Sequence, residues 1–248
     1  DKITAGWQKS DMIVLAGRPG MGKTAFVLSM ARNVAVDYNM GVAVFSLEMS
    51  CVQLVKRLMA SEARLPGEKL RRGNLRDDEF QQLHSRIKKL STAPLYIDDT
   101  PGLSIFDFRA KCRRLKSQFN IELIIIDYLQ LMEGTTPDNR VQELSRITRG
   151  LKSMARELKV PVVALSQLSR GVESRTNKRP MLSDLRESGS IEQDADLVLM
   201  IYRDEYYNPE TEDRGITEII VTKHRNGPVG TVKLLFEPQF TRFRNLAN

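Results

Sequence analysis

Eight residues near the amino terminus have the types and the spacing of a phosphate-binding loop, or P-loop. They fit the pattern G-x-x-x-x-G-K-[ST] and are Gly17, Arg18, Pro19, Gly20, Met21, Gly22, Lys23 and Thr24. An apolar run precedes the motif and a helical pattern follows it, which is the strand–loop–helix context that the motif requires. Backbone N–H groups and the helix N-terminus favour bound phosphate there. We expect Lys23 to reach the β- and γ-phosphates of a nucleotide and the Thr24 hydroxyl to bind Mg²⁺.

Three further polar residues end other apolar runs. Asp127 follows Leu123–Ile126, and an acid in that position after a P-loop predicts a Walker B residue that holds Mg²⁺. Glu48 follows a second run, where a carboxylate can polarise the attacking water; the alternative is an acid that caps the next helix. Gln167 ends a third run, either as a sensor of the γ-phosphate or as an ordinary strand-end residue. Because functional sites form at the carboxyl ends of parallel strands, we expect these residues to meet the P-loop.

The alternation of short apolar runs with longer helical patterns predicts an α/β fold. The expected strands are 12–16, 42–46, 95–97, 123–126, 162–165 and 197–201, and the expected helices are about 25–36, 50–63, 77–90, 104–119, 140–158 and 190–195. Such an order predicts a mostly parallel twisted sheet that helices cover on both faces. Near the carboxyl terminus, 217–223 and 231–236 predict an antiparallel hairpin around Asn226-Gly227-Pro228, and 241–243 a final strand.

These motifs, in this order, resemble the RecA-like ATPases, and more specifically the C-terminal motor domain of DnaB-type replicative helicases. The resemblance extends over the whole chain and is carried by Ile3–Gln8, Gly17–Thr24, Phe45–Ser50, Ile126–Met132, Leu165–Arg170, Asp184–Asp196 and Lys223–Pro228. It implies one RecA-like P-loop domain over residues 1–248 that uses ATP, or another NTP, with Mg²⁺. It also implies a motor that translocates on single-stranded DNA and unwinds the duplex at the replication fork.

The resemblance assigns roles around the nucleotide by position. Glu48 corresponds to the catalytic carboxylate, Asp127 to the Walker B acid, and Arg57 to a residue that packs on the nucleotide base. Arg225, in the expected hairpin turn, corresponds to an arginine finger that enters the neighbouring subunit's site, with Lys223 beside it. Lys23 and Gln167 complete the expected catalytic set.

The expected DNA contacts lie in loops that follow the sheet. By resemblance, Arg186, Glu187 and Gly189 contact the DNA backbone in the central channel of a ring. The stretch 167–195 contains no Phe, Tyr or Trp on which bases could stack. Its basic side chains would grip phosphates whatever the sequence, unless they form only a solvated basic loop; they include Arg170, Arg175, Lys178 and Arg179. We expect 134–139 and 168–186 to be loops that become ordered on binding.

The charge and the cysteine content narrow the class of partner. Lys and Arg number 38 against 31 Asp and Glu, and the net charge is +7. The segment Asp204–Asp213 holds five acids and no base, so the rest of the chain is more basic still, which favours a polyanionic partner over a merely soluble surface. The two cysteines have no metal or redox spacing, and no apolar run is long enough to cross a bilayer. We therefore expect a cytoplasmic protein of the nucleoid-associated replication machinery, with no membrane partner.

The chain begins at Asp1 rather than Met, and we interpret it as part of a longer protein. DnaB-type helicases also have an N-terminal domain that meets primase and a linker helix that docks on the next subunit, and neither is found in these residues. The resemblance implies a hexameric ring for the full-length protein, with primase and a helicase loader as partners, and poor assembly for this part alone. Two alternatives remain: a RecA-like strand-exchange filament, and a phosphotransferase such as a kinase. Ser46–Ser50 and Lys223–Pro228 favour the helicase.

Overall fold

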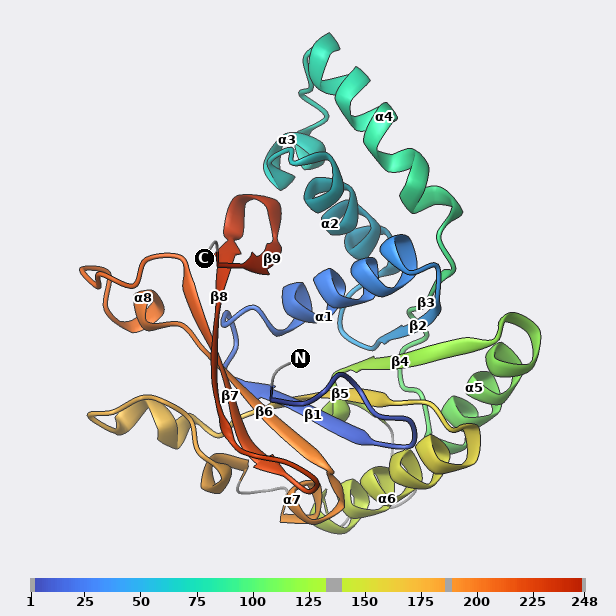
Figure 1. Cartoon of the computed structure of the whole chain (residues 1–248), viewed down its shortest axis with the longest axis vertical. Coiled ribbons are helices and arrows are strands. Elements are labelled where there is room, and N and C mark those ends of the chain that lie inside the picture. Colours follow the sequence, from blue (N-terminus) through green and yellow to red (C-terminus); the bar gives the residue numbers. More distant parts are fainter. Residues whose placement is uncertain (1–2, 133–139, 186–188, 247–248) are drawn as a thin grey trace.

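A computed structural model describes residues 3–132, 140–185 and 189–246 (Figure 1). Within these residues one nine-stranded sheet has the order β3-β2-β4-β5-β1-β6-β7-β8-β9. Its strands are β1 (Met12–Gly17), β2 (Gly41–Ser46), β3 (Leu95–Asp98), β4 (Ile121–Asp127), β5 (Val162–Gln167), β6 (Leu197–Tyr202), β7 (Ile216–His224), β8 (Gly230–Glu237) and β9 (Arg242–Asn245). The first six strands of this order, from β3 to β6, pair in parallel and include β1 and β2. Strands β7, β8 and β9 extend the sheet in antiparallel pairing.

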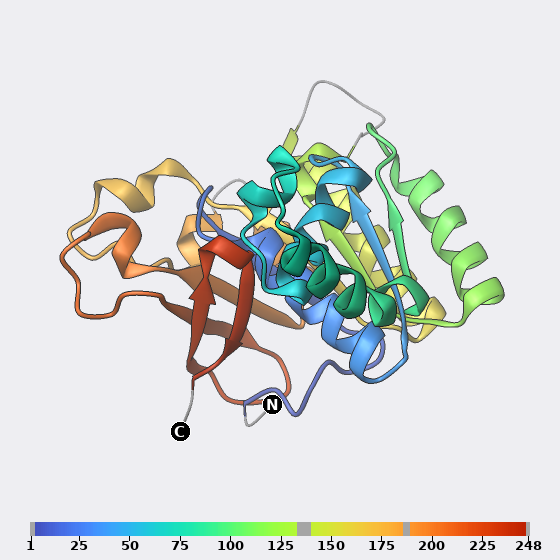
Figure 2. The same cartoon turned by 90° about the horizontal axis from the view of Figure 1, so that it is seen from above.

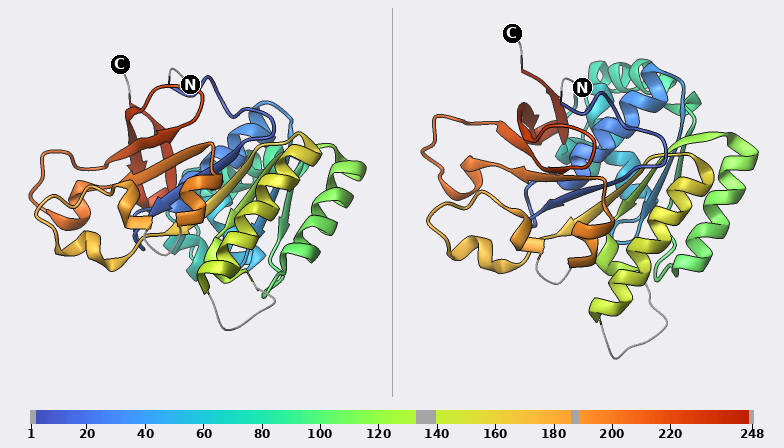
Figure 3. Two further views of the ribbon diagram at one scale, coloured as in Figure 1. Left: turned by 90° about the horizontal axis from the view of Figure 1, so that it is seen from below. Right: turned by 60° about the horizontal axis from the view of Figure 1, so that its bottom comes forward.

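Helices cover both faces of the parallel part of the sheet (Figures 2 and 3). The helices are α1 (Lys23–Arg32), α2 (Cys51–Ala63), α3 (Gly67–Arg72), α4 (Asp77–Thr92), α5 (Ile105–Phe119), α6 (Arg140–Leu158), α7 (Gly189–Asp194) and α8 (Asp204–Tyr207). Helices α5 and α6 lie side by side on one face, and α1 and α2 pack together on the other. Two layers of helix explain why β1, β2 and β6 are buried at every residue, as their unbroken apolar runs predict.

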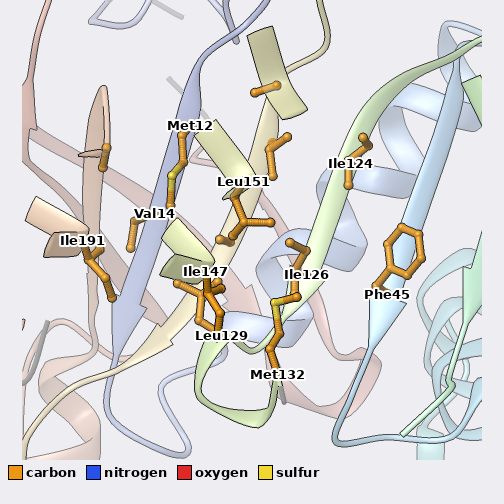
Figure 4. Packing of buried hydrophobic residues seen from close by; sticks show 14 of the residues in the cluster. Met12, Val14, Phe45, Ile124, Ile126, Leu129, Met132, Ile147, Leu151 and Ile191 are labelled. Carbon is orange, nitrogen blue, oxygen red and sulfur yellow. The ribbon is translucent and has the colours of Figure 1, made fainter. Parts of the chain in front are cut away.

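The core consists of two large apolar clusters, one on each side of the sheet. In the first, Ile147 and Leu151 of α6 pack on Met12 and Val14 of β1 and on Ile126 of β4 (Figure 4). These clusters hold the strands of the sheet in place. The polar motifs of the sequence lie at the carboxyl ends of β1, β2, β4 and β5.

Local signals set the beginnings of two helices. Ser50 caps α2, and its hydroxyl accepts from the backbone N–H of Gln53 while the Gln53 side chain accepts from the Ser50 backbone N–H. Ser104 caps α5 by accepting from the backbone N–H of Asp107 at 3.1 Å, as its position in the sequence predicts.

The expected strands, the principal helices and the terminal hairpin are all present, with some differences. The expected helix 25–36 is α-helical only to Arg32 and then widens into a π-helical turn, Asn33–Asp37. Helices α3 and α8 have no counterpart in the sequence analysis because each is short. In the expected loop 168–186, the described part contains two 3-10 segments, Arg170–Ser174 and Leu182–Leu185, held by ion pairs. That this stretch becomes ordered on binding stays a prediction, and 134–139 and Arg186 lie outside the described residues.

Candidate functional site

A cavity of about 590 Å³ opens at the carboxyl ends of β1, β2, β4 and β5. Nine of the predicted site residues line it: Pro19, Gly20, Gly22, Lys23, Thr24, Glu48, Arg57, Asp127 and Gln167. The sheet order explains the gathering, because β1 pairs with β5, β5 with β4, and β4 with β2. Residues such as Thr24 and Asp127, which lie more than a hundred positions apart in the chain, thus line the same cavity.

The P-loop needs glycine at two positions for its backbone to turn. Gly20 and Gly22 have φ of +79° and +98°, in the left-handed region that side chains avoid. A Cβ on Gly20 would also lie 2.9 Å from the ring of Tyr206 on α8, so the loop is packed closely against that helix. Helix α1 begins directly after the loop, at Lys23, and its first N–H groups have no partner within the helix. The loop therefore presents backbone donors to the cavity, as phosphate binding requires.

Three residues of the motif do not line this cavity, and for two of them the side chain points elsewhere. Met21 is 2% exposed and belongs to the apolar core. The guanidinium of Arg18 donates from Nε to Glu173 and from Nη1 to the Leu168 carbonyl oxygen, each at 2.8 Å. Gly17 ends β1 against Ile201 of β6. The prediction that all eight residues bind nucleotide stays a prediction, in which Arg18 and Met21 would take part through their backbone, while the Arg18 side chain ties the P-loop to the segment after β5.

Lys23 lines the cavity, and the pKa of its ammonium is lowered. Its ammonium donates to the carbonyl oxygens of Gly17 at 2.8 Å and Arg18 at 3.2 Å. Burial lowers the pKa of Lys23 to about 8, and the opposing attraction of Asp127 and Glu48 does not offset it. A phosphate group would supply the negative charge that this buried ammonium lacks.

Thr24 and Asp127 form the pair that the sequence predicts for Mg²⁺. The Thr24 hydroxyl donates to Asp127 Oδ2 at 2.6 Å, and Asp127 is 3% exposed. Burial raises the pKa of this carboxyl, and the hydrogen bond from Thr24 acts against the rise. Among the described residues no three His, Cys, Asp or Glu side chains gather as a metal cluster. One carboxylate beside one hydroxyl nevertheless fits Mg²⁺, which keeps several waters and takes its other ligands from phosphates.

Glu48 is exposed in a turn that two strand ends hold in place. The Ser46 hydroxyl donates to the Met49 carbonyl oxygen at 2.7 Å, and the backbone N–H of Leu47 donates to the Asp127 carbonyl oxygen at 2.8 Å. Because Ser50 caps α2, Glu48 is not required for capping, and its carboxylate is left facing the cavity. The geometry suits activation of a water beside the nucleotide.

Gln130 is a residue that the sequence analysis missed. Its side-chain nitrogen donates to the Ser166 hydroxyl at 3.0 Å and to the Gln167 carbonyl oxygen at 3.3 Å, and its oxygen accepts from the Gln167 backbone N–H at 3.3 Å. Gln130 thus clamps the end of β5. Gln167 also lines a second cavity of about 300 Å³, together with Arg18, Arg140 and Arg170. Gln130 lies within the matched stretch 126–132, but no local pattern indicates a partner on another strand.

The predicted DNA contacts have different outcomes. Arg175 is paired with Asp184 at 2.8 Å, and Arg179 with Glu218 at 2.7 Å and over the ring of Tyr202. Arg175 thus braces the segment internally, and Arg179 holds it onto β6 and β7 of the sheet, roles that the sequence analysis did not foresee. The other predicted contacts are Arg170 in the second cavity, Lys178 over the Tyr207 ring, and the exposed Gly189 at the start of α7, while Arg186 and Glu187 lie outside the described residues.

Lys223 and Arg225 lie at the opposite edge of the sheet from the cavity. His224 pairs with Leu197 at the beginning of β6, whereas the P-loop follows the end of β1, which runs parallel to β6. Arg225 Nη1 lies 3.2 Å from Asp196 Oδ1, and the Asp196 carboxylate also accepts from the backbone N–H of Met12 at 2.8 Å, where β1 begins. The structure brings this cation pair together, but not with its own P-loop.

Comparison with known proteins gives a consistent result. The family model "DnaB-like helicase C terminal domain" matches residues 1–245. The "Replicative DNA helicase DnaC" of Bacillus subtilis (strain 168) is 55% identical, and the match covers 99% of this chain and 55% of that protein. The "Replicative DNA helicase DnaB" of Geobacillus stearothermophilus is 54% identical with the same coverages. The chain therefore spans about half the length of these curated relatives.

Solved structures agree with this result. One that is described as an ATPase domain superposes with a TM-score of 0.95 at 42% identity, covering 100% of this chain and 88% of that one. Another, described as "The Structure Of A DnaB-Like Replicative Helicase And Its Interactions With Primase", matches with the same score and identity, covering 60% of that chain. In the described parts of this chain, no helix has the length and apolar character of a membrane span.

Proposed function

The chain belongs to the family of DnaB-like helicase C-terminal domains, and from that premise we propose that it is the ATP-driven motor of a replicative DNA helicase. The motor translocates on single-stranded DNA and unwinds the duplex at the replication fork. One observation carries this proposal: Lys23, Thr24, Glu48 and Asp127 come from three different strand ends and line one cavity. A nucleotide and a water held in that cavity would meet a cation, a metal-binding pair and a carboxylate at once.

The nucleotide's reaction follows from these side chains. Backbone donors of the P-loop and the Lys23 ammonium bind the phosphates, and Arg57 lies on the wall where the base would pack. Thr24 and Asp127 would hold Mg²⁺, which when bound neutralises charge on the phosphates. Glu48 orients the attacking water and accepts its proton. Gln167, whose backbone Gln130 clamps, would respond to the γ-phosphate.

Arg225 would act on a neighbouring subunit's nucleotide. A strand of six residues, about 17–20 Å long, separates the end of the sheet that holds Arg225 from the P-loop of the same chain. Arg225 therefore has no access to its own site. In a hexameric ring the hairpin turn of one subunit would face the cavity of the next and complete it.

The remaining partners are proposed for the longer protein. One solved relative is described with its primase interactions, and we extend primase, a helicase loader and a place in the nucleoid-associated replication machinery to this protein. The DNA strand would be held by the segment after β5 and by residues 186–189. A strand-exchange filament is not favoured, because the similar curated proteins are named replicative helicases. A phosphotransferase is also disfavoured, since Glu48 beside the P-loop suits attack by water.

Mixed rings of the full-length protein test the proposal. Arg225→Ala and Lys23→Ala subunits should each be nearly inactive alone, since an arginine finger contributes about 10³–10⁵ in rate in other P-loop enzymes. Mixing them should restore part of the DNA-stimulated ATPase activity, because some interfaces then pair an intact P-loop with an intact Arg225. If mixed rings form, as native mass spectrometry can establish, and no ratio restores activity, the role of Arg225 in a neighbour's site is refuted.

A further inference from the structure

Lys223 and Arg225 are held by the carboxyl end of α7 and by the two residues that follow it. Lys223 Nζ donates to the carbonyl oxygens of Glu192 and Ala195, the second at 2.8 Å. Arg225 Nη2 donates to the Gln193 carbonyl oxygen at 3.2 Å, and its Nη1 pairs with Asp196 at 3.2 Å. The last carbonyl groups of a helix have no partners within it and carry partial negative charge, so two cations are well matched to this end. Figure 1 shows α7 beside the turn between β7 and β8.

Asp196 is fixed far more firmly than the cation that it holds. Its side chain is 5% exposed, and its carboxylate accepts from the Met12 backbone N–H at 2.8 Å and from the Lys152 ammonium of α6. Its backbone N–H donates to the Met12 carbonyl oxygen at 2.9 Å, and its own carbonyl oxygen accepts from the Arg225 backbone N–H at 2.8 Å. A carboxylate with this many partners has one orientation, and one of its oxygens faces Arg225.

Arg225 remains available although it is held. Its side chain is 47% exposed, and its contacts with Asp196 and Gln193 use two of the five guanidinium donors. The contacts with Asp196 and Gln193 hold the guanidinium on one side, and its other donors face solvent. Lys223 is drawn in more closely, and burial and the neighbouring Arg225 lower its pKa.

We propose that Asp196, with the carbonyl end of α7, is a positioning residue that aims Arg225 and Lys223 at the nucleotide of a neighbouring subunit. The inference rests on the proposed function, since it needs Arg225 to act in a neighbour's site. It goes beyond that function because it assigns the orientation of Arg225 and Lys223 to the buried carboxylate of Asp196, which would not itself contact the nucleotide. Because α7 follows directly on the candidate DNA contacts Arg186 and Glu187, the same helix joins the strand-binding segment to the cations.

The test is Asp196→Asn in the full-length protein. Asparagine keeps the size of the side chain and an oxygen for the Met12 N–H, but it removes the charge that orients Arg225. Since a misplacement of about 1 Å costs about 10²-fold in rate, we expect kcat to fall about 10²-fold while the Kd for ATP is unchanged. We also expect Asp196→Asn combined with Arg225→Ala to be no slower than Arg225→Ala alone. A kcat that is unchanged or raised would overturn the proposal.

Mixed rings distinguish positioning from general damage. Asp196→Asn subunits should be rescued by Lys23→Ala subunits, as Arg225→Ala subunits should be, because the defect lies on the face that serves the neighbour. Rescue of Arg225→Ala without rescue of Asp196→Asn would overturn the positioning role and leave the proposed function intact. Failure of both would refute the action of Arg225 on a neighbour, and this inference with it.

Lys152→Met is the matched control, because it removes the other cation from the same carboxylate. It should keep kcat within about threefold of the wild type, because Arg225 retains its partner, and loss of this partly buried pair should lower stability instead. If Lys152→Met reproduced the loss of kcat, Asp196 would serve the packing of α6 rather than the aim of Arg225. Should Asp196→Asn fail to fold, the double variant Asp196→Asn/Lys152→Met removes both charges of this pair, and the same loss of kcat and the same rescue are expected of it.

Discussion

Nucleotide affinity should fall as the pH rises through the pKa of Lys23. Burial lowers this pKa to about 8 in the free protein, where the ammonium donates to the carbonyl oxygens of Gly17 and Arg18. Bound phosphate favours the charged form, so the pKa in the complex must be higher. The apparent affinity is then constant below about pH 8 and declines above it, because binding must first return a proton to Lys23.

The size of the effect follows from the value itself. With a pKa of about 8, Lys23 is about 90% protonated at pH 7 and about 10% protonated at pH 9. The dissociation constant should therefore rise about tenfold between these two pH values, which corresponds to about 1.4 kcal/mol. Phosphate groups lose their last proton near pH 6 and do not titrate in this range.

Equilibrium titration with a fluorescent ADP, at fixed Mg²⁺ and ionic strength, measures this directly. Lys23→Arg is the matched control, since a guanidinium stays charged over the whole range. Its affinity should be lower, because its fork cannot repeat both carbonyl contacts, but it should not change from pH 7 to pH 9. A flat profile in the wild type, or an equal slope in Lys23→Arg, would refute the link between burial of Lys23 and nucleotide binding.

Three other variants test separate parts of the structure. Glu48→Gln should bind ATP normally and hydrolyse it about 10²–10⁴-fold more slowly in a single-turnover assay, and near-normal turnover would reject the carboxylate as the base. In the full-length ring, Arg186→Ala should weaken single-strand binding about equally for all sequences and reduce the salt dependence by about one phosphate contact per engaged subunit. Phe108→Ala should lower the free energy of unfolding by about 3–5 kcal/mol in urea titrations, because its ring is fully buried and lies 4.7 Å from that of Phe45.

The parallel strands and the nucleotide motifs could be predicted because their signals are local. An unbroken apolar run such as 123–126 can be placed only where both faces of a strand are covered, and a glycine pattern specifies its own backbone turn. The carboxyl ends of parallel strands share one edge of the sheet, so Glu48, Asp127 and Gln167 could be assigned to one site before their distances were known.

The partners of charged side chains could not be predicted in the same way. Arg179 pairs with Glu218 across 39 positions, and Arg18 with Glu173 across 155, and neither residue type nor spacing indicates either contact. The basic segment after β5 therefore resembled a free DNA-binding loop, although part of its charge is neutralised within the chain. Position alone also did not indicate that the side chain of Met21 lies in the apolar core.

The contact between Arg18 and the segment after β5 has a thermodynamic consequence. Arg18 belongs to the P-loop through its backbone and, through Glu173 and the Leu168 carbonyl oxygen, to the segment expected to meet DNA. If the two ligands prefer different arrangements of this contact, closure of the binding cycle requires that DNA change the affinity for ATP by the same factor by which ATP changes the affinity for DNA. Cutting the contact with Glu173→Gln would then alter both factors equally, so one ion pair would set how much of the free energy of nucleotide binding is transmitted to the strand.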